Sequence, residues 1–181
     1  MILLNYPKKS LGQNFLIDEN IIKKIIAIGE INRDKTVLEI GPGTGRLTDE
    51  IINFKTKKII IVEKDKNLSI KLKEKSNNFK NLKVINADIL NFISGKIEDK
   101  KIVVYGNLPY NISTQILARL ISLSKWPPWY SKLILMFQKE VADRIIAKDN
   151  SKNFSRLTVL CNWRLQIKKH FDVSKNCFFP K

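Results

Sequence analysis

The sequence predicts an α/β fold, a mostly parallel, doubly wound sheet with helices on both faces. Short runs rich in Ile, Leu and Val alternate with stretches in which apolar residues recur every three or four positions. A glycine-rich loop, Gly41–Gly45, follows the first of these runs and precedes a helical stretch, which is typical of half a βαβ unit. At 181 residues the chain is long enough for one well-cored domain, expected over 1–181.

The predicted elements alternate along the chain. Asp18 is a suitable N-cap for the first helix, and Gly29 a suitable end. Strands are expected at 36–40, 58–63, 82–86, 101–106 and 132–138. Helices are expected at 19–28, 47–54, 66–75 and 140–147, and a further helix is expected to begin at a cap formed by Ser113. Beyond Asn150, one helix is expected from the spacing of Leu157, Leu160 and Trp163, and then one strand from the alternation of Leu165, Ile167, Phe171 and Val173.

Composition excludes several classes of protein. The chain is 44% apolar and 28% charged, and its longest apolar run, Ile59–Val62, is far short of the roughly 18 to 20 residues of a membrane span. At the N-terminus a short apolar stretch precedes the charges, the reverse of a secretory signal, so we expect a cytoplasmic protein. With Cys161, Cys177 and His170 as the only residues of their types, neither a zinc cluster nor a histidine-based triad is expected.

The charge favours a polyanionic partner. Lys and Arg number 33 against 17 Asp and Glu, a net charge of +16, and residues 91–181 carry 16 basic and 6 acidic residues. Nucleic acid is the favoured partner and a membrane surface the alternative. An excess of Lys over Arg, beside abundant Ile and Asn, is also what drift in an A+T-rich coding sequence produces, so both explanations stay open.

Candidate ligand residues follow the predicted strands, because ligands of parallel sheets bind at the carboxyl ends of the strands. Gly41, Gly43 and Gly45 permit tight turning and close approach of the backbone to a ligand. The loop lacks the Lys and Ser/Thr of a phosphate-binding P-loop, and its G-x-G-x-G spacing differs from the G-x-G-x-x-G of dinucleotide binders. Three alternating glycines favour a cofactor-binding loop over a purely structural turn. Their spacing disfavours a cofactor that contains pyrophosphate.

Polar residues end the next three strands. Glu63 is placed to accept hydrogen bonds from the hydroxyls of a ribose, with a solvated surface residue as the alternative. Asp88 is placed to accept from an adenine amino group, although a helix N-cap explains it nearly as well. Asn107-Leu108-Pro109-Tyr110 joins an amide oxygen, a turn fixed by proline and an aromatic face.

These residues resemble the ribosomal RNA adenine dimethyltransferases of the kasugamycin-resistance type, within the Rossmann-like class I S-adenosylmethionine-dependent methyltransferases. The resemblance covers almost the whole chain. Its motifs are Lys9–Leu16, Glu39–Gly45, Glu63, Asn86–Asp88, Asn107–Tyr110, Gln138–Arg144 and Phe154–Leu157. At the C-terminus, Phe178–Lys181 is similar to the opening of a motif that in the family leads into a small helical domain, so that domain is expected to be absent from this chain.

The resemblance implies S-adenosylmethionine as cofactor and adenines of small-subunit ribosomal RNA, or of a pre-30S particle, as substrate. Cofactor contacts are implied for Asn14, Leu16, Gly41, Glu63, Asp88 and Asn107, with Gly43 in the cofactor loop. The catalytic segment is Asn107, Leu108, Pro109 and Tyr110, and Phe178 is implied to flank the target adenine together with Tyr110. We expect a monomer in ribosome biogenesis, with neither a membrane nor a metal as partner.

The chemistry suits this assignment. The exocyclic amine of adenine is a poor nucleophile, and the Asn107 oxygen and the Leu108 carbonyl are two acceptors that can localise its lone pair. A large-subunit rRNA methyltransferase of the antibiotic-resistance kind is the neighbouring alternative. A binding module without turnover and a nicotinamide dehydrogenase are less favoured, because the Asn107–Tyr110 motif is intact and the glycine spacing differs.

Overall fold

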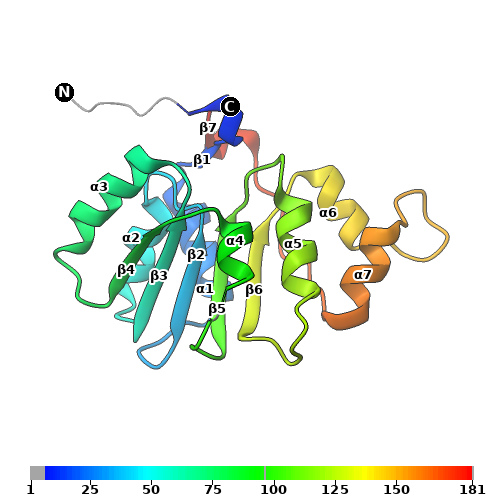
Figure 1. Ribbon diagram of the computed structural model, residues 1–181. Coiled ribbons are helices and arrows are strands. Elements are labelled where there is room, and N and C mark those ends of the chain that lie inside the picture. The colour runs from blue at the N-terminus through cyan, green and yellow to red at the C-terminus, as the bar shows by residue number, and fades with distance from the viewer. Residues whose placement is uncertain (1–6, 96, 181) are drawn as a thin grey trace.

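A parallel sheet of five strands forms the centre of the molecule, in the computed structural model that describes residues 7–95 and 97–180. The strand order is β4-β3-β2-β5-β6, and every neighbouring pair is parallel (Figure 1). The strands are β2 (Thr36–Ile40), β3 (Lys58–Glu63), β4 (Leu82–Asn86), β5 (Ile102–Asn107) and β6 (Tyr130–Met136).

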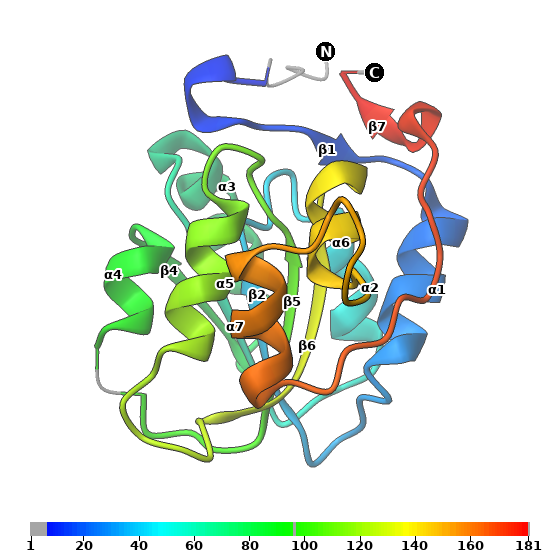
Figure 2. The same ribbon diagram turned by 90° about the vertical axis from the view of Figure 1, so that its right-hand side faces the viewer.

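Helices cover both faces of this sheet, because the strands alternate apolar side chains between the two faces. One face packs against α1 (Glu19–Ile28), α2 (Arg46–Asn53) and α3 (Lys66–Ser76). The other packs against α4 (Ile89–Ile93) and α5 (Ser113–Ile121). The pair α6 (Lys139–Ile145) and α7 (Arg156–Arg164) extends this second layer by packing against α5 (Figure 2).

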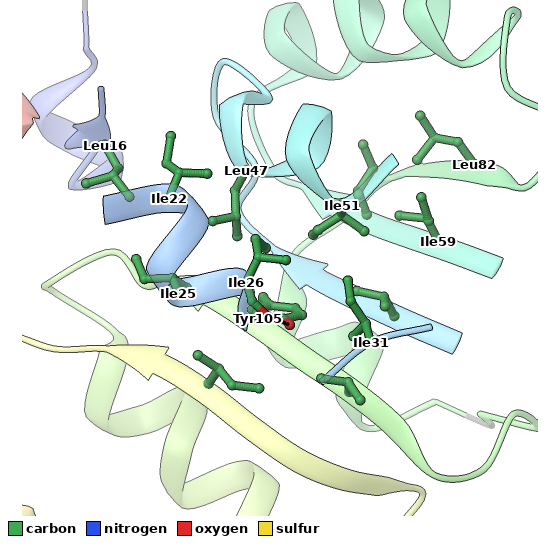
Figure 3. Packing of buried hydrophobic residues seen from close by; sticks show 14 of the residues in the cluster. Leu16, Ile22, Ile25, Ile26, Ile31, Leu47, Ile51, Ile59, Leu82 and Tyr105 are labelled. Atoms are coloured by element: carbon green, nitrogen blue, oxygen red, sulfur yellow. Dashed lines mark hydrogen bonds between the residues drawn. The ribbon is translucent and has the colours of Figure 1, made fainter. Parts of the chain in front are cut away.

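The first core layer is built around Tyr105, which is fully buried among the isoleucines of α1 and the neighbouring strands (Figure 3). Its hydroxyl donates a hydrogen bond of 2.8 Å to the Ile26 carbonyl near the end of α1. Burial raises the pKa of this phenol, so it stays a neutral donor. Gly29 ends α1 directly beside the ring and leaves room for the hydroxyl.

A second, two-stranded antiparallel sheet joins the two ends of the described chain. In it β1 (Phe15–Leu16) pairs with β7 (Phe178–Phe179), and Leu16 lies opposite Phe178. The short helices η1 (Lys9–Leu11) and η2 (Lys175–Cys177) flank these strands. The sheet lies beyond the carboxyl ends of the central strands, where it places residues 10–16 over them (Figures 1 and 2).

The predicted α/β class and parallel sheet are confirmed, and the elements expected before Arg164 are present, with every bound that was predicted within two residues of the observed one. The strand expected over Leu165–Val173 is wrong. Leu165 has extended backbone angles, but no described strand pairs with this segment, and a strand requires a hydrogen-bonded neighbour. Ser113 is the first residue of α5 rather than its cap, since the N-cap position is Ile112.

The described residues contain neither a candidate membrane span nor a candidate metal cluster. No helix there has the length and apolar character needed to cross a membrane. Among the same residues, no group of three or more His, Cys, Asp or Glu side chains is arranged to hold a metal ion.

Replacing Gly29 by Ala tests the packing beneath Tyr105. Gly29 has ordinary helical angles, so alanine is compatible with the backbone, but its Cβ atom would lie 1.7 Å from the Tyr105 hydroxyl. We expect Gly29→Ala to lower the free energy of unfolding by about 1 to 3 kcal/mol, as overpacking does. Urea unfolding should show a smaller loss when the same change is made in a Tyr105→Phe background. Equal losses in both backgrounds would rule out this steric explanation.

Candidate active site

The candidate site lies where the chain reverses its direction across the sheet. From β2 the chain proceeds to β3 and β4 on one side, and β5 and β6 lie on the other. The loops after β2 and β5 therefore separate at their carboxyl ends, which is where open α/β sheets bind ligands. Gly41 follows β2, and Asn107 ends the adjacent β5.

The glycine loop has the conformation that its sequence requires. Gly41, Gly43 and Gly45 all have positive φ angles, of 63°, 59° and 83°. A Cβ atom on Gly43 would lie 2.8 Å from the Phe15 ring, whereas one on Gly41 would meet no protein atom within 4 Å. The space beside Gly41 belongs to a pocket, so the bare backbone there is open to a ligand.

Glu63 holds the glycine loop from the end of β3. Its side chain is 5% exposed and accepts hydrogen bonds from the Gly43 N–H (3.1 Å) and the Asp65 N–H (2.8 Å). Burial raises the pKa of this carboxyl group, although backbone donors at Asp65, Gly43 and Lys64 partly oppose the effect. Glu63 also lines the pocket, and a carboxylate has about four acceptor positions, more than these backbone donors occupy.

Asp88 has a structural role in addition to its position in the pocket. It is the N-cap of α4, where its Oδ1 atom accepts from the Leu90 N–H at 2.9 Å, so the N-cap interpretation is confirmed. Its Oδ2 atom lies 2.9 Å from the Lys64 ammonium. The Lys64 contact, together with the Leu90 N–H, holds the pKa of Asp88 below its usual range.

Asn14, Asn107 and Tyr110 form a hydrogen-bonded chain at the end of β5. Asn107 donates from Nδ2 to the Asn14 carbonyl at 2.6 Å, and Asn14 donates from its own Nδ2 to the Tyr110 hydroxyl at 3.0 Å. Within residues 7–95 and 97–180, no donor contacts the Asn107 Oδ1 atom. The Asn14 Oδ1 atom is buried and lacks a partner among the same residues. Two amide oxygens are thus available as acceptors where the pocket opens.

The segment that carries Asn14 is anchored by Asp65, a residue that the sequence analysis did not single out. Asp65 caps α3 and also contacts the Lys8 ammonium (2.8 Å) and the Gln13 amide (3.1 Å). Burial alone would raise the pKa of Asp65, but Lys8, Gln13 and the N–H groups of α3 together hold it below its usual range. The position of an aspartate directly before a helix was the available sequence signal.

Most of the predicted site residues line one pocket. These residues are Asn14, Leu16, Gly41, Gly43, Glu63, Asp88, Asn107, Leu108 and Pro109. Tyr110 and Phe178 line a neighbouring groove instead, and Asn14 and Asn107 line both hollows. Phe178 is only 8% exposed, because it also packs into the first core layer. The polar junction of Asn14 and Asn107 therefore lies between the pocket and the groove.

Glu39, whose role was not assigned from the sequence, lies in β2 at the base of the pocket and is 2% exposed. It accepts a hydrogen bond of 2.6 Å from the Thr48 hydroxyl of α2. Burial raises the pKa of Glu39 to about 8. The side chain is therefore mainly protonated at neutral pH, and it fixes α2 against the sheet as a neutral acid.

This sheet order, glycine loop and polar junction define a Rossmann-like class I methyltransferase fold, and solved structures agree. A dimethyladenosine transferase from Plasmodium falciparum is similar at a TM-score of 0.69 and 34% identity, over 81% of this chain and 51% of that one. The 23S rRNA methyltransferase ErmE is similar at a TM-score of 0.62 and 29% identity, over 72% and 50%. Residues 5–181 match the family described as Ribosomal RNA adenine dimethylase, and the chain belongs to this family.

Several curated relatives are described as Ribosomal RNA small subunit methyltransferase A. The protein of that name from Pelagibacter ubique is 51% identical over 96% of this chain, and the one from Malacoplasma penetrans is 45% identical over 97%. The chain spans 65% and 62% of their lengths. It thus corresponds to a little under two thirds of these relatives.

The pH dependence of stability tests the state of Glu39. Between about pH 4.5 and 8 the folded chain keeps a proton on Glu39 that the unfolded chain has lost, so Glu39 lowers stability as pH rises through this window. Glu39→Gln keeps an acceptor for Thr48 without the titration. Urea unfolding should show that the variant gains stability relative to the unmodified chain between pH 5 and pH 8.5. A constant difference across that range would contradict a buried, protonated Glu39.

Proposed function

We propose that the chain transfers methyl groups from S-adenosylmethionine to the exocyclic amine of adenines in small-subunit rRNA, giving N6,N6-dimethyladenine. The observation that carries the proposal is the junction of Asn14 and Asn107, which opens to the pocket on one side and to the groove of Tyr110 on the other. A methyl donor and an adenine bound in the two hollows would meet at these two amide oxygens.

The donors and acceptors of the pocket fit S-adenosylmethionine. The open space beside Gly41 accepts a ligand close to the backbone, and Glu63 retains acceptor positions for ribose hydroxyls. The unpartnered Asn14 Oδ1 atom suits an ammonium or amide donor. When bound, S-adenosylmethionine supplies an electrophilic methyl group on a sulfonium centre. Gly43 and Leu16 would enclose it, and Asp88 would accept from its adenine amine.

The residues after β5 would prepare the target amine. The Asn107 Oδ1 atom and the Leu108 carbonyl each accept one N–H of the amine, which localises its lone pair toward the methyl donor. The Asn107 amide can hold this orientation because its Nδ2 atom is already bonded to the Asn14 carbonyl. Pro109 fixes the turn that aims the Leu108 carbonyl.

Tyr110 would hold the adenine ring by stacking, with Phe178 on the other side of the base. Positive charge that develops on the amine nitrogen is stabilised by the oriented carbonyl dipoles, and the excess proton then leaves to water. Stacking on Tyr110 requires an adenine that is unpaired or flipped out of a helix. A monomethylated amine still has one N–H for these acceptors, which permits the second transfer.

The choice of small-subunit RNA follows curated relatives that are described as small subunit methyltransferases. The net charge of +16 supports an RNA substrate or a pre-30S particle. We propose that the chain acts in the cytoplasm as a monomer. In the family, the motif that begins at Phe178–Lys181 leads into a small helical domain, and we propose that such a domain contributes to docking on the RNA rather than to the chemistry.

Methyl transfer to under-methylated small subunits tests this function. With labelled S-adenosylmethionine, nucleoside mass spectrometry of the unmodified chain should detect dimethyladenine. Asn107→Ala should lower the rate roughly 100- to 1,000-fold, the typical cost of losing one oriented partner of the developing charge. Tyr110→Ala should lower it about 10- to 100-fold through the loss of base stacking.

The control for these variants is Asn91→Ala, which replaces an exposed asparagine of α4. It should retain the unmodified rate. In a parallel assay with large subunits, dimethyladenine formed there and not on small subunits would transfer the assignment to the alternative substrate. Monomethyladenine alone, or methyl groups on cytosine or protein, would refute the proposed function.

A further inference from the structure

Three aromatic and basic side chains form a stack at the end of the sheet opposite the candidate site. The Arg164 guanidinium carbon lies 3.9 Å from the centroid of the Trp163 ring and 4.8 Å from that of the Trp126 ring. Trp163 belongs to α7, and Trp126 to the loop between α5 and β6. We name this set, Trp126, Trp163 and Arg164, the tryptophan platform.

The platform is rigid where it meets the fold and exposed where it faces outward. Arg164 donates from Nη1 to the carbonyls of Ile121 and Leu123 at the end of α5, at 2.9 and 2.8 Å. The Trp163 side chain is nevertheless 63% exposed and that of Trp126 40%. The hydrogen bonds to these two carbonyls therefore explain the position of Arg164. They do not explain why most of the Trp163 side chain is exposed to solvent.

The chain segments that supply the platform carry charge of one sign. Residues 100–139 and 150–171, which supply it, contain eleven Lys or Arg and no Asp or Glu. Within the described residues no carboxylate pairs with Arg164, whose contacts are two carbonyls and two indole rings. A coding bias that replaces Arg by Lys does not remove acidic residues from particular stretches, and residues 1–90 retain eleven of them. The distribution of charge thus indicates a polyanionic partner.

We infer that the tryptophan platform is a second RNA contact, at which an unpaired base stacks on Trp163 while nearby cations meet the phosphates. Single-stranded nucleic acid is held by this combination of aromatic faces and a basic surface. Exposed Lys125 precedes Trp126, and with exposed Arg119 it lines the same groove as Arg164. The choice of RNA as the polyanion rests on the proposed function.

The platform is distinct from the site of methyl transfer. The groove that contains Tyr110 and Phe178 continues to Trp126 and Arg164. β6 runs from Tyr130, beside the platform, to Met136 near Asn107. Seven residues of strand at about 3.3 Å each separate the two contacts by roughly 20 Å. An RNA that places its adenine at Tyr110 can therefore reach the platform with a neighbouring single-stranded segment.

Binding of a single-stranded, unpaired oligoadenylate of about twelve nucleotides tests the inference without requiring turnover. Anisotropy titrations should show that Trp163→Ala weakens the affinity about 5- to 100-fold, the range expected when a stacking face is lost. Lys125→Ala should instead reduce the slope of log affinity against log salt concentration by about 1, the change expected when one phosphate contact is lost. Tryptophan fluorescence should be quenched by the RNA in the unmodified chain and less in Trp163→Ala.

The matched control is Val159→Ala, which removes another exposed apolar side chain one turn earlier in α7. It should keep the unmodified affinity within about twofold, and both variants should retain the unmodified urea midpoint. Unchanged oligoadenylate affinity in Trp163→Ala overturns the inference. Vesicles of anionic phospholipid provide the second arm, and Trp163-dependent binding to them alone would assign the platform to a membrane surface.

The two proposals can fail separately. Oligoadenylate binding that depends on Trp163, in a chain that forms no dimethyladenine, would support the platform and refute the proposed function. If Trp163→Ala forms dimethyladenine at the rate of the unmodified chain and binds oligoadenylate with the same affinity, the platform is refuted and the proposed function stands.

Discussion

The hydrogen bond from Asn107 to the Asn14 carbonyl, 2.6 Å long, is the contact on which the site depends. It joins the end of β5 to residues that lie about ninety positions earlier in the chain. The Asn107 side chain thereby lines both the pocket and the neighbouring groove. Asp65 anchors the same N-terminal segment from α3, and the β1–β7 pair holds it from the other side. Because of these anchors, the two amide oxygens at the junction keep a fixed direction.

The inside and the outside of the molecule differ in charge. Glu39, Glu63 and Asp88 line the pocket of a chain whose net charge is +16. Burial of Glu39 raises its pKa to about 8, so this side chain is mainly uncharged at neutral pH. Lys64 keeps Asp88 ionised and offsets its negative charge. The pocket therefore offers mainly polar acceptors and little net negative charge, whereas the basic exterior favours a polyanion. The exterior charge agrees with the RNA substrate proposed above.

Local patterns were sufficient to predict most of the fold, because the core strands are continuous apolar runs and the helices have clear periodicity. The predicted ligand residues also lie together, since they end parallel strands. Long-range pairing could not be read in this way: the two-residue strand β1 has no periodicity and depends on Phe178, more than 160 positions away. The alternation over Leu165–Val173 predicted a strand, but a partner strand is a property of the tertiary structure. Asp65 was missed because its contacts with Lys8 and Gln13 come from a distant segment.

Calorimetric titration with S-adenosylmethionine tests the junction most directly, because it requires neither RNA nor turnover. The unmodified chain should bind one equivalent. Asn14→Ala removes the unpaired acceptor, and Glu63→Ala removes the proposed ribose acceptor. Each should weaken binding by about 1 to 3 kcal/mol, or roughly 5- to 150-fold, the cost of leaving buried polar groups without partners. Absence of binding by the unmodified chain, or unchanged affinity in both variants, would contradict the assignment of this pocket to the methyl donor.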